Sequence, residues 1–419
     1  MNKIFSSLLL IVSVVLIQLP IAAEVSAAGA ENSEKPKRKT QLVGPSVGKK
    51  VGKAFEAYSA DDIPGALVIL LDIGAKKEYD KAYVARFIAV MYATMGNEEA
   101  NAIKYLKVAV GPDILNERDH GDAIKLLADL QMQVEDFADA LVNYKAWMDF
   151  TGKSDGNTWT KIANAHYALK QLDKMIVPAN NAIAAYGDKQ NKNPYILKVT
   201  SYYESKKYKD AVKTLETVLQ IFPEDKTWWT QLGMFYLLVE DYKKGLETLD
   251  LAYKQGFLVK ESEIKTLASL YSQSLVPHKA ALLLEKHIDS GLVPRDDKNL
   301  SSIANAWHAA QHIDKAASYY GELAKMTNLA KHYSKQGMLL KQDEQFKPAI
   351  IALNKAIELG VKNEGRLQMS IAESHFYLEQ YKQAYKAISS AMKDPKTRKS
   401  ARGWESFIKD TAQRKKVAI

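Results

Sequence analysis

The chain has 419 residues, with 58 Lys and Arg against 49 Asp and Glu, and it has no cysteine. The lack of cysteine excludes disulfide bonds and a lipid-modified cysteine anchor. The net charge of +9 is carried by the two ends, and the body between them is close to neutral. No basic stripe therefore points to nucleic acid as a partner.

Residues 1–27 have the order of a secretory signal peptide. Lys3 is followed by an apolar run from Ile4 to Leu19, and Val25, Ser26 and Ala27 form a small-residue cleavage signal. We expect export to the periplasm with cleavage after Ala27. The alternative is an uncleaved membrane anchor, although the apolar run falls short of the roughly 20 residues that span a bilayer. Residues 28–46, rich in Lys, Pro, Gly and Ser, are predicted to be a disordered basic lead-in.

A pattern with a period of 34 residues begins near residue 47 and ends near 395. Its clearest unit has Trp229, Leu232, Gly233 and Tyr236, followed by Gly245, Leu249 and Ala252. A helix that packs closely on its partner needs a small residue such as Gly233 beside large apolar residues three or four positions away. Weaker units, from Ala54 and Ala66 to Ala372 and Ala384, give about ten helical hairpins at a spacing of roughly 33 to 38 residues. Pro178 falls inside one expected second helix and predicts a kink or a late start there.

This pattern resembles the tetratricopeptide repeat (TPR) family over residues 47–395. The resemblance implies an all-α, right-handed superhelical solenoid with a terminal capping helix, here in residues 396–419. Such solenoids mostly bind peptides or proteins and carry no chemistry of their own. The stretches 38–49, 58–63 and 251–258 also resemble periplasmic TPR proteins encoded beside TonB-type energy-transduction genes. That resemblance implies a TonB-system component as partner.

The two ends of the chain are basic. Residues 35–53 hold seven Lys or Arg and no acid, and residues 393–419 hold nine against three acids. An anionic envelope surface or an acidic partner fits this charge, and simple solvation of the tails is the alternative.

No catalytic site emerges from the motifs. Gly44, Gly48 and Lys49 are one residue short of a phosphate-binding loop and follow no strand. His308 and His312 stand four apart and could share a helix face, but no third metal ligand accompanies them. We therefore predict a protein that is not an enzyme and that uses no cofactor and no metal.

The predicted site is the concave groove, lined by the face of each first helix that its hairpin partner leaves open. Tyr203, Met234 and Leu237 form the most apolar part of this face and are the expected anchor. We predict two alternative functions, a periplasmic adaptor that supports a TonB-type system or an accessory factor for cell-wall or outer-membrane assembly. The predicted partner-binding residues are Thr160, Asn164, Tyr167, Tyr203, Thr230, Met234, Leu237, Lys265, Ser269, Asn305 and His308.

Overall fold

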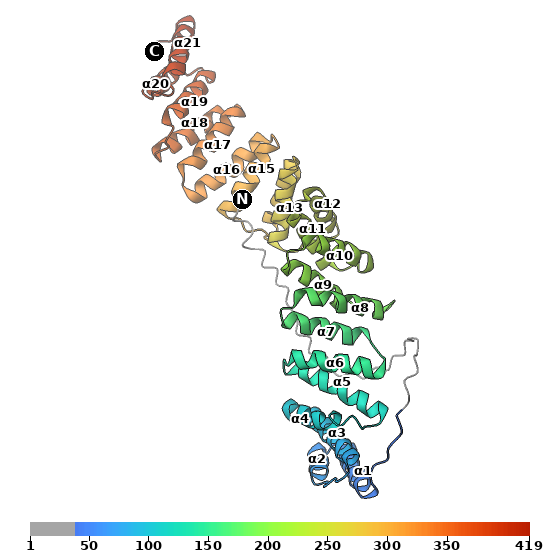
Figure 1. Cartoon of the computed structure of the whole chain (residues 1–419). Coiled ribbons are helices and arrows are strands. Elements are labelled where there is room, and N and C mark those ends of the chain that lie inside the picture. The colour runs from blue at the N-terminus through green and yellow to red at the C-terminus, as the bar shows by residue number, and fades with distance from the viewer. Residues whose placement is uncertain (1–37) are drawn as a thin grey trace. The chain divides into compact units, whose positions relative to one another are not determined.

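The computed structural model describes residues 38–419, which are helical and contain no β-strand. The predicted signal peptide and residues 28–37 of the lead-in lie outside the described residues. The described chain forms two compact units, one ending at Phe222 and the other beginning at Pro223. In each unit the helices follow one another in chain order (Figure 1).

The first unit holds five helical hairpins. Each odd-numbered helix pairs with the even-numbered helix that follows it. The helices are α1 (Pro45–Ser59), α2 (Ile63–Leu71), α3 (Glu78–Met95), α4 (Glu99–Val110), α5 (Glu117–Gln133), α6 (Phe137–Thr151), α7 (Gly156–Ala168), α8 (Ile176–Tyr186), α9 (Asn193–Glu204) and α10 (Tyr208–Ile221).

The second unit holds five more hairpins and a final single helix. The expected number of about ten hairpins is therefore confirmed. The helices are α11 (Lys226–Leu238), α12 (Tyr242–Lys254), α13 (Glu261–Gln273), α14 (Pro277–Asp289), α15 (Asp297–Ala309), α16 (Ile313–Thr327), α17 (Ala330–Gln342), α18 (Phe346–Glu358), α19 (Glu364–Tyr377), α20 (Tyr381–Ala391) and α21 (Arg398–Arg414).

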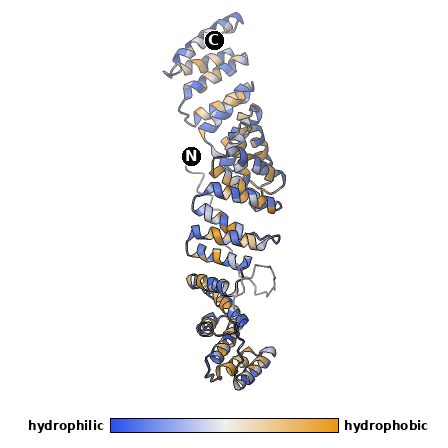
Figure 2. Ribbon diagram, turned by 45° about the vertical axis from the view of Figure 1, so that its right-hand side comes forward, coloured by the Kyte–Doolittle hydropathy of each residue, from blue (hydrophilic) through white to orange (hydrophobic). Residues whose placement is uncertain are grey.

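Small residues allow the two helices of a hairpin to pack closely against each other. A Cβ atom added at Gly233 would lie 2.5 Å from Cγ of Leu249, and one at Gly337 would lie 2.6 Å from Cγ of Leu353. Both leucines are fully buried. Apolar side chains alternate with polar ones on the helices, so hydrophilic and hydrophobic colours mix along the ribbon (Figure 2). The prediction that Gly233 marks a close helix approach is confirmed.

Proline shifts the start of one second helix. Residues Leu172–Met175 form a single 3-10 turn, and α8 begins only at Ile176, which places Pro178 in its first turn. Proline is tolerated there because the first amide groups of a helix have no internal acceptor. The late start expected from Pro178 is confirmed.

The described part of the lead-in differs from the expected disorder. Residues 45 and 46 already belong to α1, and residues 38–44, the N-terminal segment, are hydrogen-bonded to α3 and to the loop between α4 and α5. The backbone N–H of Gln41 donates to Oδ1 of Asn116, whose Nδ2 donates to the carbonyl of Gln41, at 2.8 and 3.1 Å. The N–H of Gly44 donates to Oδ1 of the buried Asp80 at 2.9 Å.

Arg38 fastens the start of this segment. Its guanidinium donates to the carbonyl oxygens of Asp113 and Leu115 at 2.8 and 3.1 Å and pairs with the Asp113 carboxylate. It also lies over the ring of Phe150, 4.6 Å from the ring centroid. Composition predicted disorder here because it does not show that a single arginine has three acceptors and an aromatic ring within reach.

Replacing Arg38 with alanine is expected to destabilise the first unit by about 1–2 kcal/mol, because several hydrogen bonds and a cation–π contact are lost. Hydrogen exchange should accelerate in residues 113–116, which contact the segment. Lys39→Ala is the matched control, since Lys39 is exposed and has no hydrogen bond or ion pair within residues 38–419. Equal stability of the two variants would show that the segment contributes nothing to the fold.

The last helix closes the second unit. Ala401, Ile408 and Ala412 of α21 are fully buried, and the first two belong to the core formed with α19 and α20. Side chains on the opposite side of α21, such as Ser406 and Asp410, are exposed.

Candidate partner-binding site

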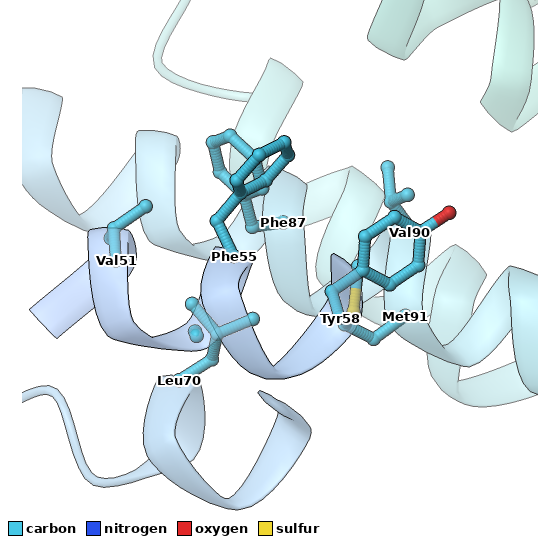
Figure 3. A pocket seen from close by; sticks show the side chains of 8 residues that line it. Val51, Phe55, Tyr58, Leu70, Phe87, Val90 and Met91 are labelled. Carbon is cyan, nitrogen blue, oxygen red and sulfur yellow. The ribbon is translucent and has the colours of Figure 1, made fainter. Parts of the chain in front are cut away.

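An apolar pocket of about 120 Å³ lies where α1, α2 and α3 meet in the first unit. Figure 3 shows its lining side chains. The hydroxyl of Tyr58 points away from Leu70 (Figure 3), so an apolar surface faces the pocket. Eight residues line it: Val51, Ala54, Phe55, Tyr58, Leu70, Phe87, Val90 and Met91.

The pocket has a buried floor and an exposed rim. Val51, Leu70 and Met91 are buried and belong to the core of the first hairpins. Phe55 follows the buried Ala54 on α1 and remains 58% exposed although it is a large apolar side chain. Exposed aromatic residues beside a preformed hollow are typical of binding surfaces.

A row of aromatic rings extends the pocket along α3. Tyr79, Tyr83 and Phe87 stand four residues apart, with ring centroids 6.0 Å and then 5.1 Å from one another. Burial, with a smaller effect from Asp119, raises the pKa of Tyr79, so its hydroxyl stays neutral at physiological pH. Tyr79 is buried, so only Tyr83 and Phe87 of this row are accessible to apolar and aromatic groups.

One charged pair borders this row. Arg86 forms an ion pair with Asp119 at 3.1 Å and lies over the ring of Phe87, 5.3 Å from its centroid. Tyr58 is the one lining residue with a titratable side chain, and no nucleophile or carboxylate joins it. Apart from the Tyr58 hydroxyl, the side chains that line the pocket are therefore apolar.

The predicted groove residues in the first unit are mostly engaged within the protein. Thr160 is buried, and its hydroxyl donates to the carbonyl of Gly156 at 2.6 Å, so it cannot contact a partner. Tyr167 donates to Glu204 at 2.9 Å. Its pKa is raised by burial and by this bond. Asn164 and Tyr203 are half-buried, and Tyr203 lies 6.0 Å from the ring of Tyr208.

The two predicted anchor residues of the second unit are largely covered by the protein itself. Met234 is buried and only 8% exposed. Leu237 is half-buried and packs towards α12, because a Cβ atom at Gly245 would lie 2.8 Å from its Cδ2. Tyr203 belongs to the first unit and the other two residues to the second.

Other predicted residues of the second unit remain accessible. Ser269 and Asn305 are exposed, although the hydroxyl of Tyr320 donates to Asn305. Lys265 pairs with Glu261 at 3.0 Å. Thr230 is half-buried and donates to the carbonyl of Lys226 at 3.3 Å.

His308 and His312 do not form the pair on one helix face that their spacing suggested. His312 lies with its ring centroid 5.1 Å from that of His278 and 5.0 Å from that of Trp307. His308 is half-buried, and its pKa is lowered by burial and by Lys335. In residues 38–419, no three His, Cys, Asp or Glu side chains are grouped so that they could hold a metal ion.

Within the part of the chain that the structure describes, none of the helices combines enough length with enough apolar character to span a bilayer.

Known proteins resemble this chain in structure only. No protein family and no curated protein matches the sequence. A TPR protein from Parabacteroides merdae ATCC 43184 is similar over 61% of this chain and 98% of its own, with 14% identity and a TM-score of 0.35. YrrB, described as a TPR protein with an unusual peptide-binding site, is similar over 43% of this chain and 92% of its own, with 17% identity and a TM-score of 0.35.

A third similar structure is that of Naa15/Naa10 bound to HypK-THB. The similarity covers 88% of this chain and 68% of the other chain, with 13% identity and a TM-score of 0.48. The chain is thus an all-α array of helical hairpins, and structures of TPR proteins are among those similar to it.

Proposed function

We propose that this protein is a non-enzymatic scaffold that binds a protein partner, and that the pocket of α1, α2 and α3 receives an apolar side chain of that partner. The observation that carries the proposal is the 58% exposed Phe55 at the rim of an apolar hollow. Binding hot spots are typically few, aromatic and seated in such pockets.

We further propose that the protein works in the periplasm and supports a TonB-type system. The apolar run Ile4 to Leu19, the cleavage signal at Ala27 and the resemblance of residues 38–49 support this proposal. The alternative is an accessory factor that positions enzymes of cell-wall or outer-membrane assembly. Recovery of the mature protein from the periplasm, with its N-terminus at residue 28, would support export, whereas a retained Met1 in the membrane fraction would contradict it.

A pull-down from envelope extract tests the binding function. The wild type, a Phe55→Ala/Phe87→Ala variant and a Val68→Ala control should be compared. Val68 is an exposed apolar residue of α2 that does not line the pocket. The proposal predicts a protein that the wild type and the control retain and the pocket variant loses. Equal recovery by all three would contradict it.

A further inference from the structure

We propose that the C-terminal end of the second unit is a surface that binds anionic phospholipid bilayers peripherally. The proposal does not depend on the pocket in the first unit. It combines two features of α21 and its neighbours, namely exposed aromatic rings and an excess of cations over carboxylates.

The aromatic rings form a connected cluster at this end. The ring of Phe376 on α19 lies 5.0 Å from that of Phe407 and 5.7 Å from that of Trp404, both on α21. Tyr377 stacks on Phe346 with a centroid distance of 5.1 Å. Tyr377 and Phe407 are 60% and 47% exposed, so part of this cluster faces water.

A glycine lies next to Phe407 on the surface of α21. Gly403, one turn before Phe407, has no atom within 4 Å of the position that a Cβ would take. Arg414 lies two turns after Phe407 on the same side of α21, since seven residues make about two turns. An aromatic ring is thus exposed on a helix side that also carries a cation.

Most cations at this end form no ion pair, although Arg402 lies close enough to Glu405 to help lower the pKa of that carboxyl. Among residues 38–419, no carboxylate forms an ion pair with Lys393, Lys396, Lys399, Arg402 or Lys416, and all five side chains are exposed. Two cations are neutralised, since Lys409 pairs with Glu405 at 2.9 Å and Lys415 with Glu379 at 3.5 Å. Asp410 is the exposed carboxylate of this helix side. The positive charge that remains is unbalanced.

The basic N-terminal end has fewer features that suit a bilayer. Arg38 is held by Asp113, Leu115 and Phe150, and Lys50 pairs with Asp72 at 2.8 Å. Its exposed aromatic ring, Phe55, belongs to the pocket proposed above for a protein partner. Of the two basic ends predicted from the sequence, the C-terminal one therefore fits a bilayer better.

A bilayer fits these features through two additive contributions. Lys and Arg near an anionic membrane surface are attracted to its headgroups, and amphipathic aromatic rings settle at the boundary between headgroups and acyl chains. Neither contribution alone gives stable attachment. The combination predicts reversible binding that requires anionic lipid and weakens at high salt.

Vesicle co-sedimentation of the whole chain tests the proposal. The lipids are phosphatidylcholine alone and phosphatidylcholine mixed with phosphatidylglycerol. We expect binding only to the mixed vesicles. It should fall about fivefold for each cation removed in Lys399→Gln/Arg402→Gln, and about tenfold or more in Phe407→Ala.

Phe55→Ala is the matched control, because it removes a phenylalanine of the other unit that is at least as exposed as Phe407. Thermal unfolding should confirm that each variant folds, and the glutamine variant keeps the test valid if Phe407→Ala does not. Equal binding to neutral vesicles, no binding of the wild type, or an equal loss in Phe55→Ala would each overturn the proposal. Vesicle binding that persists while the pull-down fails would refute only the scaffold function.

Discussion

Replacing Gly233 with leucine is expected to destabilise the second unit by about 1–3 kcal/mol. The added side chain must enter the space already filled by the fully buried Leu249, whose Cγ would lie 2.5 Å from the new Cβ. Overpacking of this kind forces side chains out of their preferred rotamers and shifts the backbone. Urea denaturation followed by far-UV circular dichroism would measure the loss.

Gly403→Leu is the matched control for this substitution. Gly403 also lies within a helix, but no atom is within 4 Å of its Cβ position, so the same side chain would point into open space. A leucine there should be neutral or slightly stabilising, because glycine is a poor helix former. Equal destabilisation by both substitutions would show that helix propensity, and not the α11–α12 contact, determines the effect.

The damage from Gly233→Leu should also begin locally. In an array of repeats each hairpin contacts mainly its neighbours, so α11 and α12 should lose hydrogen-exchange protection first. Uniform loosening of the whole second unit would contradict the repeat description.

Truncating Phe55 or Phe87 to alanine is expected to weaken binding of the protein partner by about 2 kcal/mol or more, which is about 30-fold in the dissociation constant. Both rings line the apolar pocket, and a partner side chain seated there would lose its contacts. Isothermal titration with the partner recovered in the pull-down would measure the change. Val68→Ala should leave the affinity unchanged, and a loss as large as that of Phe55→Ala would refute the pocket as the anchor.

The sequence predicted the repeat well because local packing rules determine it. Gly233 and Leu249 are spaced as two close helices require, and the same spacing recurs through the chain, so the number of hairpins could be counted. Pro178 also gave a correct local prediction, because a proline acts on its own helix.

The exposure of the predicted site residues was harder to predict, because it depends on neighbouring hairpins. Met234, Ser269 and Asn305 follow the small residue of their hairpins directly, at Gly233, Ala268 and Ala304. They are nevertheless buried in the first case and exposed in the other two. A projection onto one helix cannot distinguish these cases, because it contains no information about how tightly the next hairpin packs.

The pocket was missed for a related reason. In the sequence, Phe55 and Phe87 stand next to small and apolar residues of the first two hairpins and look like core residues. Only the arrangement of α1, α2 and α3 shows that one ring is left largely exposed beside a hollow. The available signal in the sequence was an aromatic residue, Phe55, next to a residue of the repeat core. This signal is weak because apolar side chains also make up much of ordinary protein surfaces.

Site-specific photo-crosslinking tests the scaffold function most directly. A photoreactive phenylalanine analogue would be placed at position 55, at the pocket rim. In a second variant it would be placed at the exposed position 68 of α2. The account predicts that a partner in envelope extract becomes attached at position 55 and not at position 68. Attachment of the same protein at both positions with equal yield, or at position 68 alone, would contradict it.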